Sequence, residues 1–435
     1  MTNILFNEKL ALAGGEPVIA EPLPADVTIG KAEADAAMRA FDRGSLSAFF
    51  GSWGPEFLGG DEVKAFEQEW AAKFSVPHVV SVNSATSGLI AAMGAIGLSP
   101  GDEVIVPPYT MSATAMAPLF YGGIPVFADI EPETFCLDPE SVAAAITDKT
   151  KAIIVVNLFG HAAQLSELAA LAKARGIFLI EDNAQGPLAT QNGQYAGTFG
   201  DIGIFSLNYH KHIHTGEGGM CVTHDGTLAL RMQAIRNHAE NIVDPAGIAD
   251  LTNMIGQNYR MTELSAAVGR CQLDKVEDEV GRRQRLAEHL SDGLRDLEGL
   301  TVPVVREGCR HVYYVWALRV DEEALGVSRA DFSAALTAEG FPHSTGYLRP
   351  LYMLPAFQQR KAIGRDGWPF TLTNRQYHEG LCPVAEQMYS HELLLFEPCA
   401  YRVDEALADK LVVAVRKVHA RRHEIAAAAA ASRAG

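Results

Sequence analysis

The chain has 435 residues, more than one ordinary hydrophobic core accommodates, so we expect two domains. Its formal charge of −17 comes without any basic tract, which argues against nucleic acid or an acidic membrane surface as a partner. The six cysteines occur singly and form no Cys-x-x-Cys pair, so neither a zinc ribbon nor a disulfide framework is indicated. This cysteine usage fits a reducing cytoplasm.

The N-terminal segment carries no recognisable targeting signal. It contains the acidic Glu8 and no apolar run of signal-peptide length, and nowhere do about 18 uncharged apolar residues occur together. We therefore expect no export and no membrane span, and a cytoplasmic location.

From residue 61 the pattern alternates between helix and strand. Apolar residues at helical spacing predict helices over 61–74, 86–98, 141–150 and 164–176. Short apolar runs predict strands over 78–82, 102–108, 124–130, 151–159, 177–182 and 200–207, with 218–225 as a hairpin-like return. Continuously apolar strands that alternate with helices are typical of a parallel sheet covered on both faces.

After residue 261 the pattern changes to a long helix over 263–294. A strand over 311–320 and helices over 329–340 and 405–423 then predict a second, smaller α+β domain. We place an N-terminal arm and a large domain over 1–267, the small domain over 268–425 and an Ala-rich tail over 426–435.

Polar residues stand at the carboxyl ends of several strands of the predicted sheet. These stretches are 84–86, 107–110 and 182–185. Ligands of open α/β sheets bind beyond the carboxyl ends of the strands, so we expect a binding crevice there.

The segment NYHKHIHTGEGG, residues 208–219, raises a choice between histidine and lysine chemistry. His210, His212 and His214 share a face if the segment is extended, as metal ligands would. A zinc site normally draws its ligands from separate elements, so this signal is weak. Lys211 alone reads as a solvated surface lysine, but it follows an apolar strand and precedes a glycine-rich turn, which favours a functional role.

Asp182 ends a predicted strand and has two interpretations. It is either the N-cap of a following helix or a carboxylate that pairs with a pyridinium nitrogen. An aspartate combined with a lysine that binds an aldehyde is the protein part of pyridoxal 5′-phosphate (PLP) chemistry. Ser84 to Thr86 and Ser206 would supply donors for a phosphate. No Gly-x-Gly-x-x-Gly or Walker-type motif occurs, so the usual marks of nucleotide cofactors are missing.

The order of motifs over nearly the whole chain resembles the DegT/DnrJ/EryC1/StrS aminotransferases. The resemblance is carried by LALAGGEPV, GGDEVKAFEQEWAAKF, GDEVIVPPYTMSATA, PVFADIEPETFCLDP, FLIEDNAQ, FSLNYHKHIHTGEGG, IGQNYRMTELSAAVG and CPVAE. It implies the α/β fold of fold-type I PLP-dependent transferases, which is aspartate aminotransferase-like, with a large domain built on a mainly parallel sheet and a smaller C-terminal α+β domain.

The resemblance also implies roles for individual residues. Lys211 and Asp182 would be catalytic, the lysine by binding the cofactor and the aspartate by pairing with its ring nitrogen. The remaining cofactor contacts would come from Ala85, Thr86, Met111, Gln185, Ser206 and Asn258. Among these, Ala85, Thr86 and Ser206 would hold the phosphate, and Gln185 would lie near the phenolic oxygen. Met111 departs from the family, which usually has an aromatic ring there.

Asn258 would reach the phosphate of the neighbouring subunit, which implies a homodimer with shared active sites. The residues expected at the acceptor are Trp53, His343, Tyr347 and Arg349. The implied reaction moves an amino group from glutamate or glutamine to a keto sugar, expected to be nucleotide-linked, or to a keto cyclitol, in antibiotic or other secondary metabolism or in surface-sugar synthesis.

Three alternatives remain at this stage. A PLP-dependent sugar dehydratase of the same fold is disfavoured because that subgroup has histidine where this chain has Lys211. A non-enzymatic PLP-binding regulator is disfavoured by the missing DNA-binding appendage and basic face. A metal-dependent enzyme would use the three histidines, although no metal is expected.

Overall fold

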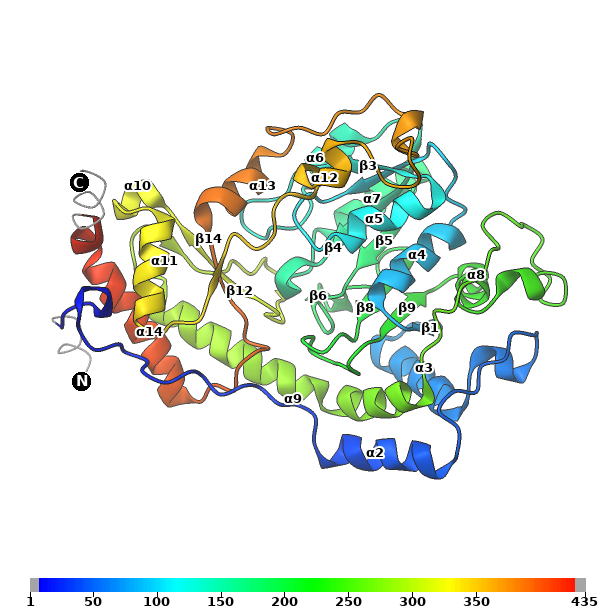
Figure 1. Cartoon of the computed structure of the whole chain (residues 1–435), viewed down its shortest axis with the longest axis horizontal. Coiled ribbons are helices and arrows are strands. Elements are labelled where there is room, and N and C mark those ends of the chain that lie inside the picture. The colour runs from blue at the N-terminus through cyan, green and yellow to red at the C-terminus, as the bar shows by residue number, and fades with distance from the viewer. Residues whose placement is uncertain (1–7, 427–435) are drawn as a thin grey trace.

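The computed structural model describes residues 8–426 of the chain, and Figure 1 shows its two parts. The larger part is built on a seven-stranded sheet in the order β1-β9-β8-β5-β4-β2-β3, in which β9 alone runs antiparallel to its neighbours. The strands are β1 (His78–Val82), β2 (Glu103–Val106), β3 (Ile124–Phe127), β4 (Thr150–Val156), β5 (Phe178–Asp182), β8 (Ile202–Ser206) and β9 (Gly219–Thr223). The mainly parallel sheet expected from the sequence is confirmed.

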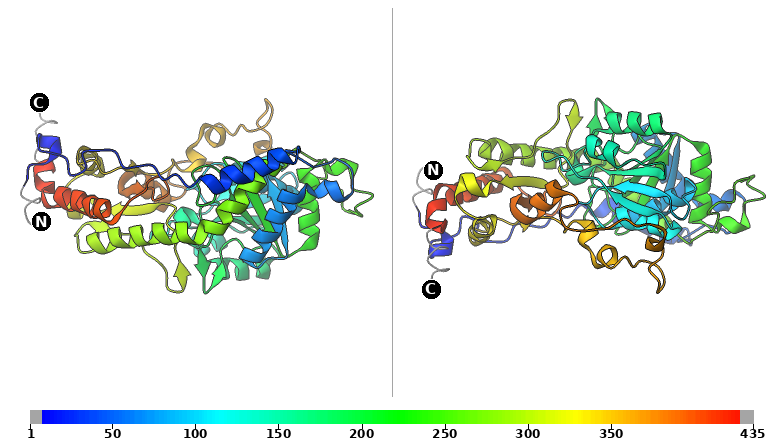
Figure 2. Two further views of the ribbon diagram at one scale, coloured as in Figure 1. Left: turned by 90° about the horizontal axis from the view of Figure 1, so that it is seen from below. Right: turned by 90° about the horizontal axis from the view of Figure 1, so that it is seen from above.

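Helices pack around this sheet (Figure 2). α4 contacts α8, β8 and β9, while α7 contacts β5. The helices of this part are α2 (Lys31–Asp42), α3 (Asp61–Phe74), α4 (Ala85–Ala95), α5 (Ala113–Met116), α6 (Pro139–Ala145), α7 (Leu165–Arg175) and α8 (Gly226–Arg236).

The smaller part has a four-stranded sheet in the order β10-β12-β14-β13. Its strands are β10 (Leu300–Thr301), β12 (Trp316–Val320), β13 (Ser344–Thr345) and β14 (Leu393–Phe396). The C-terminal helices are α10 (Glu322–Leu325), α11 (Arg329–Ala338), α12 (Pro355–Gln358), α13 (Pro383–Gln387) and α14 (Glu405–Ala420). A third small sheet joins β11 (Cys309–Arg310), β6 (Thr190–Gln191) and β7 (Gln194–Tyr195) across the two parts.

The long helix α9 (Glu263–Leu294) connects the two parts along the lower side of Figure 1, with α2 beside it. Val276 and Val280 pack in the larger core, whereas Leu286 and the apolar residues after it pack in the smaller one. The predicted boundary between 267 and 268 therefore falls inside a continuous helix. The arm residues Leu10 and Ile19 pack in the smaller core, although the sequence grouped the arm with the large domain.

Several predicted elements are shorter than expected, and two of them show why. The helix predicted over 141–150 is α6, which begins after Asp138 caps it and ends at Ala145, because Thr150 starts β4. The strand predicted over 311–320 is reduced to β12, since the amides of Val312 and Val315 donate to carbonyl groups of the large domain instead. Elements outside the predictions include α2, α8 and β14.

Within residues 8–426, none of the helices combines the length and the apolar character that a bilayer crossing requires.

Candidate active site

A pocket of about 380 Å³ lies at the carboxyl ends of β4, β5 and β8, the edge that the sequence indicated. Eight of the predicted site residues line it: Ala85, Thr86, Met111, Asp182, Gln185, Ser206, Lys211 and Tyr347. The fold thus brings together the residues that were expected to hold a phosphate, a ring nitrogen and an aldehyde.

Lys211 lies in the turn that follows β8. Its amide donates to the carbonyl of Asn208 at 2.9 Å, and its Nζ lies 4.1 Å from the centre of the Tyr314 ring. Burial lowers the pKa of Lys211 to about 8, although the Asp182 carboxylate opposes the shift. A lysine with this pKa has a sizeable fraction of neutral, nucleophilic amine near neutral pH, unlike a solvated lysine.

Asp182 is the last residue of β5, and its carboxylate is buried. Oδ2 accepts a hydrogen bond from the Thr114 hydroxyl at 2.8 Å, and Oδ1 accepts one from the Ala184 amide at 3.2 Å. Burial raises the pKa of Asp182, while Thr114, Ala184 and the charge of Lys211 oppose the shift. The bond to Ala184 forms a local turn and no helix begins here, so the helix N-cap interpretation is wrong.

The N-terminus of α4 forms the polar floor of the pocket. Ser84 is the N-cap residue and accepts a bond from the Ser87 amide at 3.0 Å, whereas the amides of Ala85 and Thr86, in the first turn, have no partners within the helix. Such amides, together with the helix dipole, favour an anion. A Cβ on Gly219 would lie 2.7 Å from the Ala85 nitrogen, so this glycine lets β9 approach the helix end.

These groups fit PLP. Free amides of α4 and the Ser206 hydroxyl suit its phosphate, the buried Asp182 carboxylate suits a ring N–H, and Lys211 suits the aldehyde. Gln185 lines the same wall, where its Oε1 accepts from the Phe159 amide at 2.7 Å and its Nε2 donates to the Tyr347 hydroxyl at 2.9 Å.

Met111 lines the pocket and is 58% exposed, so its thioether is accessible to a flat ring. Asn258 does not line the pocket of its own chain. It is exposed, and its carbonyl accepts a bond from Asn83 at 3.3 Å beside the start of α4. Its reach to a neighbouring subunit stays a prediction.

Among the expected acceptor residues, only Tyr347 lines the pocket. Trp53 packs against Phe57 with 5.4 Å between ring centres. His343 is bonded to the Ser333 hydroxyl at 2.7 Å, and Arg349 is exposed. The roles of Trp53, His343 and Arg349 therefore stay predictions.

The three histidines of the segment 208–219 do not converge. His210 lines the pocket, His212 is bonded to Arg283, and His214 is bonded to the Thr28 hydroxyl. No group of three or more His, Cys, Asp or Glu side chains within 8–426 is arranged to hold a metal ion.

Several residues of the site lay outside the sequence predictions, chiefly Tyr314, Asn208 and Glu217 in the pocket and Thr114 beside it. Thr114 does not line the wall but supports Asp182, and its position in the stretch TMSATA, after a predicted strand, was the available signal. Tyr314 precedes β12 and carried no local signal, because its role depends on packing between segments that are distant in the chain.

Comparison with known proteins gives a consistent picture. The model of the DegT/DnrJ/EryC1/StrS aminotransferase family matches residues 53–395. The L-glutamine:2-deoxy-scyllo-inosose aminotransferase of Streptoalloteichus tenebrarius is 33% identical over 422 residues, covering 94% of this chain and 97% of the relative. The GDP-perosamine synthase of Caulobacter vibrioides is 34% identical over 331 residues, covering 74% of this chain and 86% of the relative.

A solved structure of GDP-4-keto-6-deoxy-D-mannose-3-dehydratase from E. coli, with bound hydrated PLP, superimposes with a TM-score of 0.76 and 25% identity, covering 92% of this chain and 99% of that one. The family match spans most of the chain, and the pocket carries the residues that its cofactor needs. The chain therefore belongs to the DegT/DnrJ/EryC1/StrS family and is a PLP-dependent aminotransferase.

Proposed function

We propose that this enzyme transfers the amino group of glutamate or glutamine to the keto carbon of a keto sugar or keto cyclitol. The observation that carries the proposal is the placement of Lys211 over Tyr314, within one pocket with Asp182 and the free amides of α4. A relative of almost the same length, named for L-glutamine and 2-deoxy-scyllo-inosose, supports this donor and acceptor class.

The proposed role of each residue follows from its environment in the pocket. PLP, when bound, supplies the carbonyl that takes up the amino group and a ring that withdraws electrons. Asp182, held by Thr114, keeps a proton at the ring nitrogen. Ala85, Thr86 and Ser206 bind the phosphate. Lys211, with its lowered pKa, would move the proton between the donor's α-carbon and C4′ of the cofactor as general base and acid.

We favour a keto cyclitol over a nucleotide-linked keto sugar as the acceptor. The relative that covers 94% of this chain is named for 2-deoxy-scyllo-inosose, which is a cyclitol without a nucleotide. This preference agrees with a place in antibiotic or other secondary metabolism.

We further propose a cytoplasmic homodimer with shared active sites, in which Asn258 reaches the partner's phosphate. Exposed apolar side chains before and near α3 support a protein interface, among them Val27, Phe41, Phe50 and Trp53. The proposed division into a large and a small domain follows the two cores joined by α9. Trp53, His343 and Arg349 would then act at the acceptor side of the assembled site.

In the test, the PLP-loaded protein receives L-glutamine or L-glutamate labelled with ¹⁵N at the α-amino group. Each donor is combined with 2-deoxy-scyllo-inosose in one reaction and with GDP-4-keto-6-deoxy-D-mannose in another. Mass spectrometry should find the label in an amine made from the cyclitol. A labelled product from the nucleotide sugar alone would contradict the preferred acceptor. Loss of water from the acceptor without uptake of label would contradict amino transfer and favour the dehydratase alternative, which Lys211 disfavours.

A further inference from the structure

A buried polar cluster adjoins Lys211 outside the walls of the pocket. It consists of His212, Arg283 and Asp26, and the side chains of Arg283 and Asp26 are 1% and 0% exposed. His212, with 2% exposed, follows Lys211 in the chain. Arg283 lies in the middle of α9, and Asp26 belongs to the N-terminal arm, so three distant segments meet here.

Arg283 is the centre of the cluster. Its Nη1 donates to Nδ1 of His212 at 2.9 Å, and its Nη2 donates to Oδ2 of Asp26 at 3.1 Å. Because a guanidinium group has no acceptor and keeps its charge, Nδ1 of His212 must be the acceptor and the ring proton lies on Nε2. Burial, with the nearby charges of Arg283 and Lys211, holds the pKa of His212 well below its ordinary value. His212 is thus a neutral ring in one tautomer.

The cluster also contacts the small domain. Sγ of Cys399, which follows β14, lies 3.7 Å from Nδ1 of His212. The His212 ring lies 6.2 Å from the ring of Tyr314, which carries the Lys211 amine on its face. Arg283 lies on α9 between Val280 of the larger core and Leu286 of the smaller one. The cluster therefore fixes both the loop of Lys211 and the domain that supplies its aromatic neighbour.

We propose that Arg283 and His212 are positioning residues for Lys211. Arg283, anchored by Asp26, holds the His212 ring, and the ring holds the adjacent backbone so that the Lys211 amine stays over Tyr314 and away from bulk water. Both residues would act through Lys211, without contacting the cofactor or the substrate. The proposal rests on the proposed function, in which Lys211 moves the proton, and it assigns a role to the second of the three histidines.

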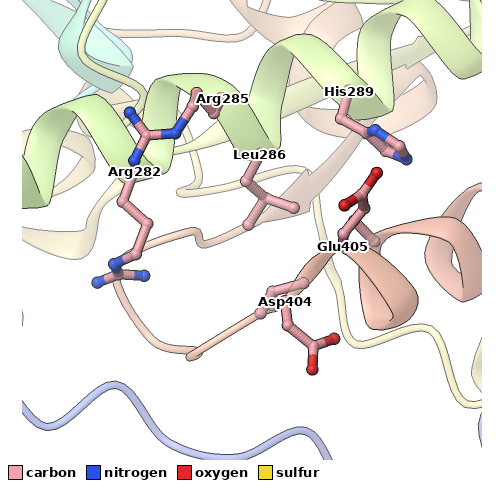
Figure 3. Close-up of a pocket in the computed structure, with 8 residues that line it drawn as sticks. Arg282, Arg285, Leu286, His289, Asp404 and Glu405 are labelled. Carbon is pink, nitrogen blue, oxygen red and sulfur yellow. The ribbon is translucent and has the colours of Figure 1, made fainter.

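The chain offers a matched control in Arg282. Arg282 also pairs with Asp26, and with Glu279, but its bonds do not include His212. Its side chain lies at a separate pocket, where α9 faces Asp404 and Glu405 at the start of α14 (Figure 3). R282M and R283M each remove one guanidinium group from Asp26, and R283M alone removes the donor to His212.

The experiment uses the full chain with four variants, R283M, R282M, H212F and H212N. Asparagine keeps an acceptor near the position of Nδ1, whereas phenylalanine removes it. Steady-state assays of the PLP-loaded proteins give kcat and the KM of the donor. In PLP-free protein, labelling with an amine-reactive reagent at a series of pH values, followed by peptide mass spectrometry, gives the midpoint at which Lys211 becomes reactive.

R283M and H212F should lower kcat on the order of 100-fold with little change in KM, because a displaced catalytic group costs about that much. Both should move the labelling midpoint of Lys211 from about 8 upward, toward the value of a solvated lysine. R282M and H212N should stay within a few-fold of the native kcat and keep its midpoint.

Equal effects of R282M and R283M on the midpoint would overturn the proposal, since the cluster would then be merely structural. If R283M does not fold, the comparison of H212F with H212N tests the proposal instead. Equal labelling midpoints of Lys211 in these two variants would also overturn the proposal. The labelling midpoint of Lys211 is measured without any substrate. If the variants show the expected midpoints but the native protein transfers no amino group from any donor, the result would count against the proposed function and not against the positioning role.

Discussion

The Lys211 amine lies 4.1 Å from the centre of the Tyr314 ring. Lys211 follows β8 of the large sheet, and Tyr314 precedes β12 of the small sheet while its ring packs in the larger core, so this contact joins two distant segments of the chain. A cation on an aromatic face gains about 0.5–2 kcal/mol, depending on how far it is desolvated. The segment that leads into the small sheet therefore helps to place the Lys211 amine.

Replacement of Lys211 by alanine should abolish turnover, because no other described residue of the pocket carries an amine. Borohydride reduction of the native protein with PLP should fix the cofactor on the peptide that contains Lys211, as mass spectrometry can check. The exposed Lys173 provides the control, and K173A should keep full activity. Repeated turnover by K211A without added amine would show that the base lies elsewhere.

Replacement of Thr114 by valine should lower kcat/KM by about 10- to 100-fold, the cost of losing one hydrogen bond to a charged group. The Thr114 hydroxyl donates to Asp182, and without it burial would raise the pKa of the carboxyl further. T114S, which keeps the hydroxyl, is the matched control. Equal kinetics for T114V and T114S would mean that this bond does not support Asp182.

The rate at which the PLP-free protein captures PLP should follow the neutral fraction of Lys211. Burial lowers the pKa of this amine to about 8, so the rate should rise as the pH increases toward 8 and level off above it. At one pH unit below the midpoint the rate should be about tenfold under the plateau. Stopped-flow absorbance measures the capture. A rate that keeps rising to about pH 10, as for free N-acetyl-lysine, would mean that the lysine is solvated.

Mixed dimers test the role of Asn258. Aspartate at this position would repel a phosphate, so N258D should be as inactive as K211A. If Asn258 serves the partner's site, a mixture of both variants should regain about a quarter of the native activity, because half of the dimers then contain one complete site. Subunits are exchanged by co-expression and assayed together. A mixture with no recovered activity would place Asn258 in the site of its own chain.

The fold was largely predictable because the alternation of apolar strands and helices is a local property of the sequence. The motifs likewise indicated Lys211 and Asp182, which the structure brings to one sheet edge. Contacts between distant segments carried no local signal, and this is why the role of Tyr314 emerged only from the three-dimensional arrangement.

The domain boundary shows the same limit. The sequence pattern changes near residue 261, where α9 begins, but the two cores divide further along this helix. Trp53, His343 and Arg349 were assigned by family position, and none lines the pocket of the single chain.

The most direct test of the account is the donor half of the reaction. The PLP-loaded protein is given L-glutamine or L-glutamate without any acceptor, and the oxo acid released is quantified. We predict about one equivalent per subunit and then a halt until a keto acceptor is added, the behaviour of a two-stage exchange. No oxo acid from either donor, with PLP bound at Lys211, would contradict amino transfer as the function of this pocket.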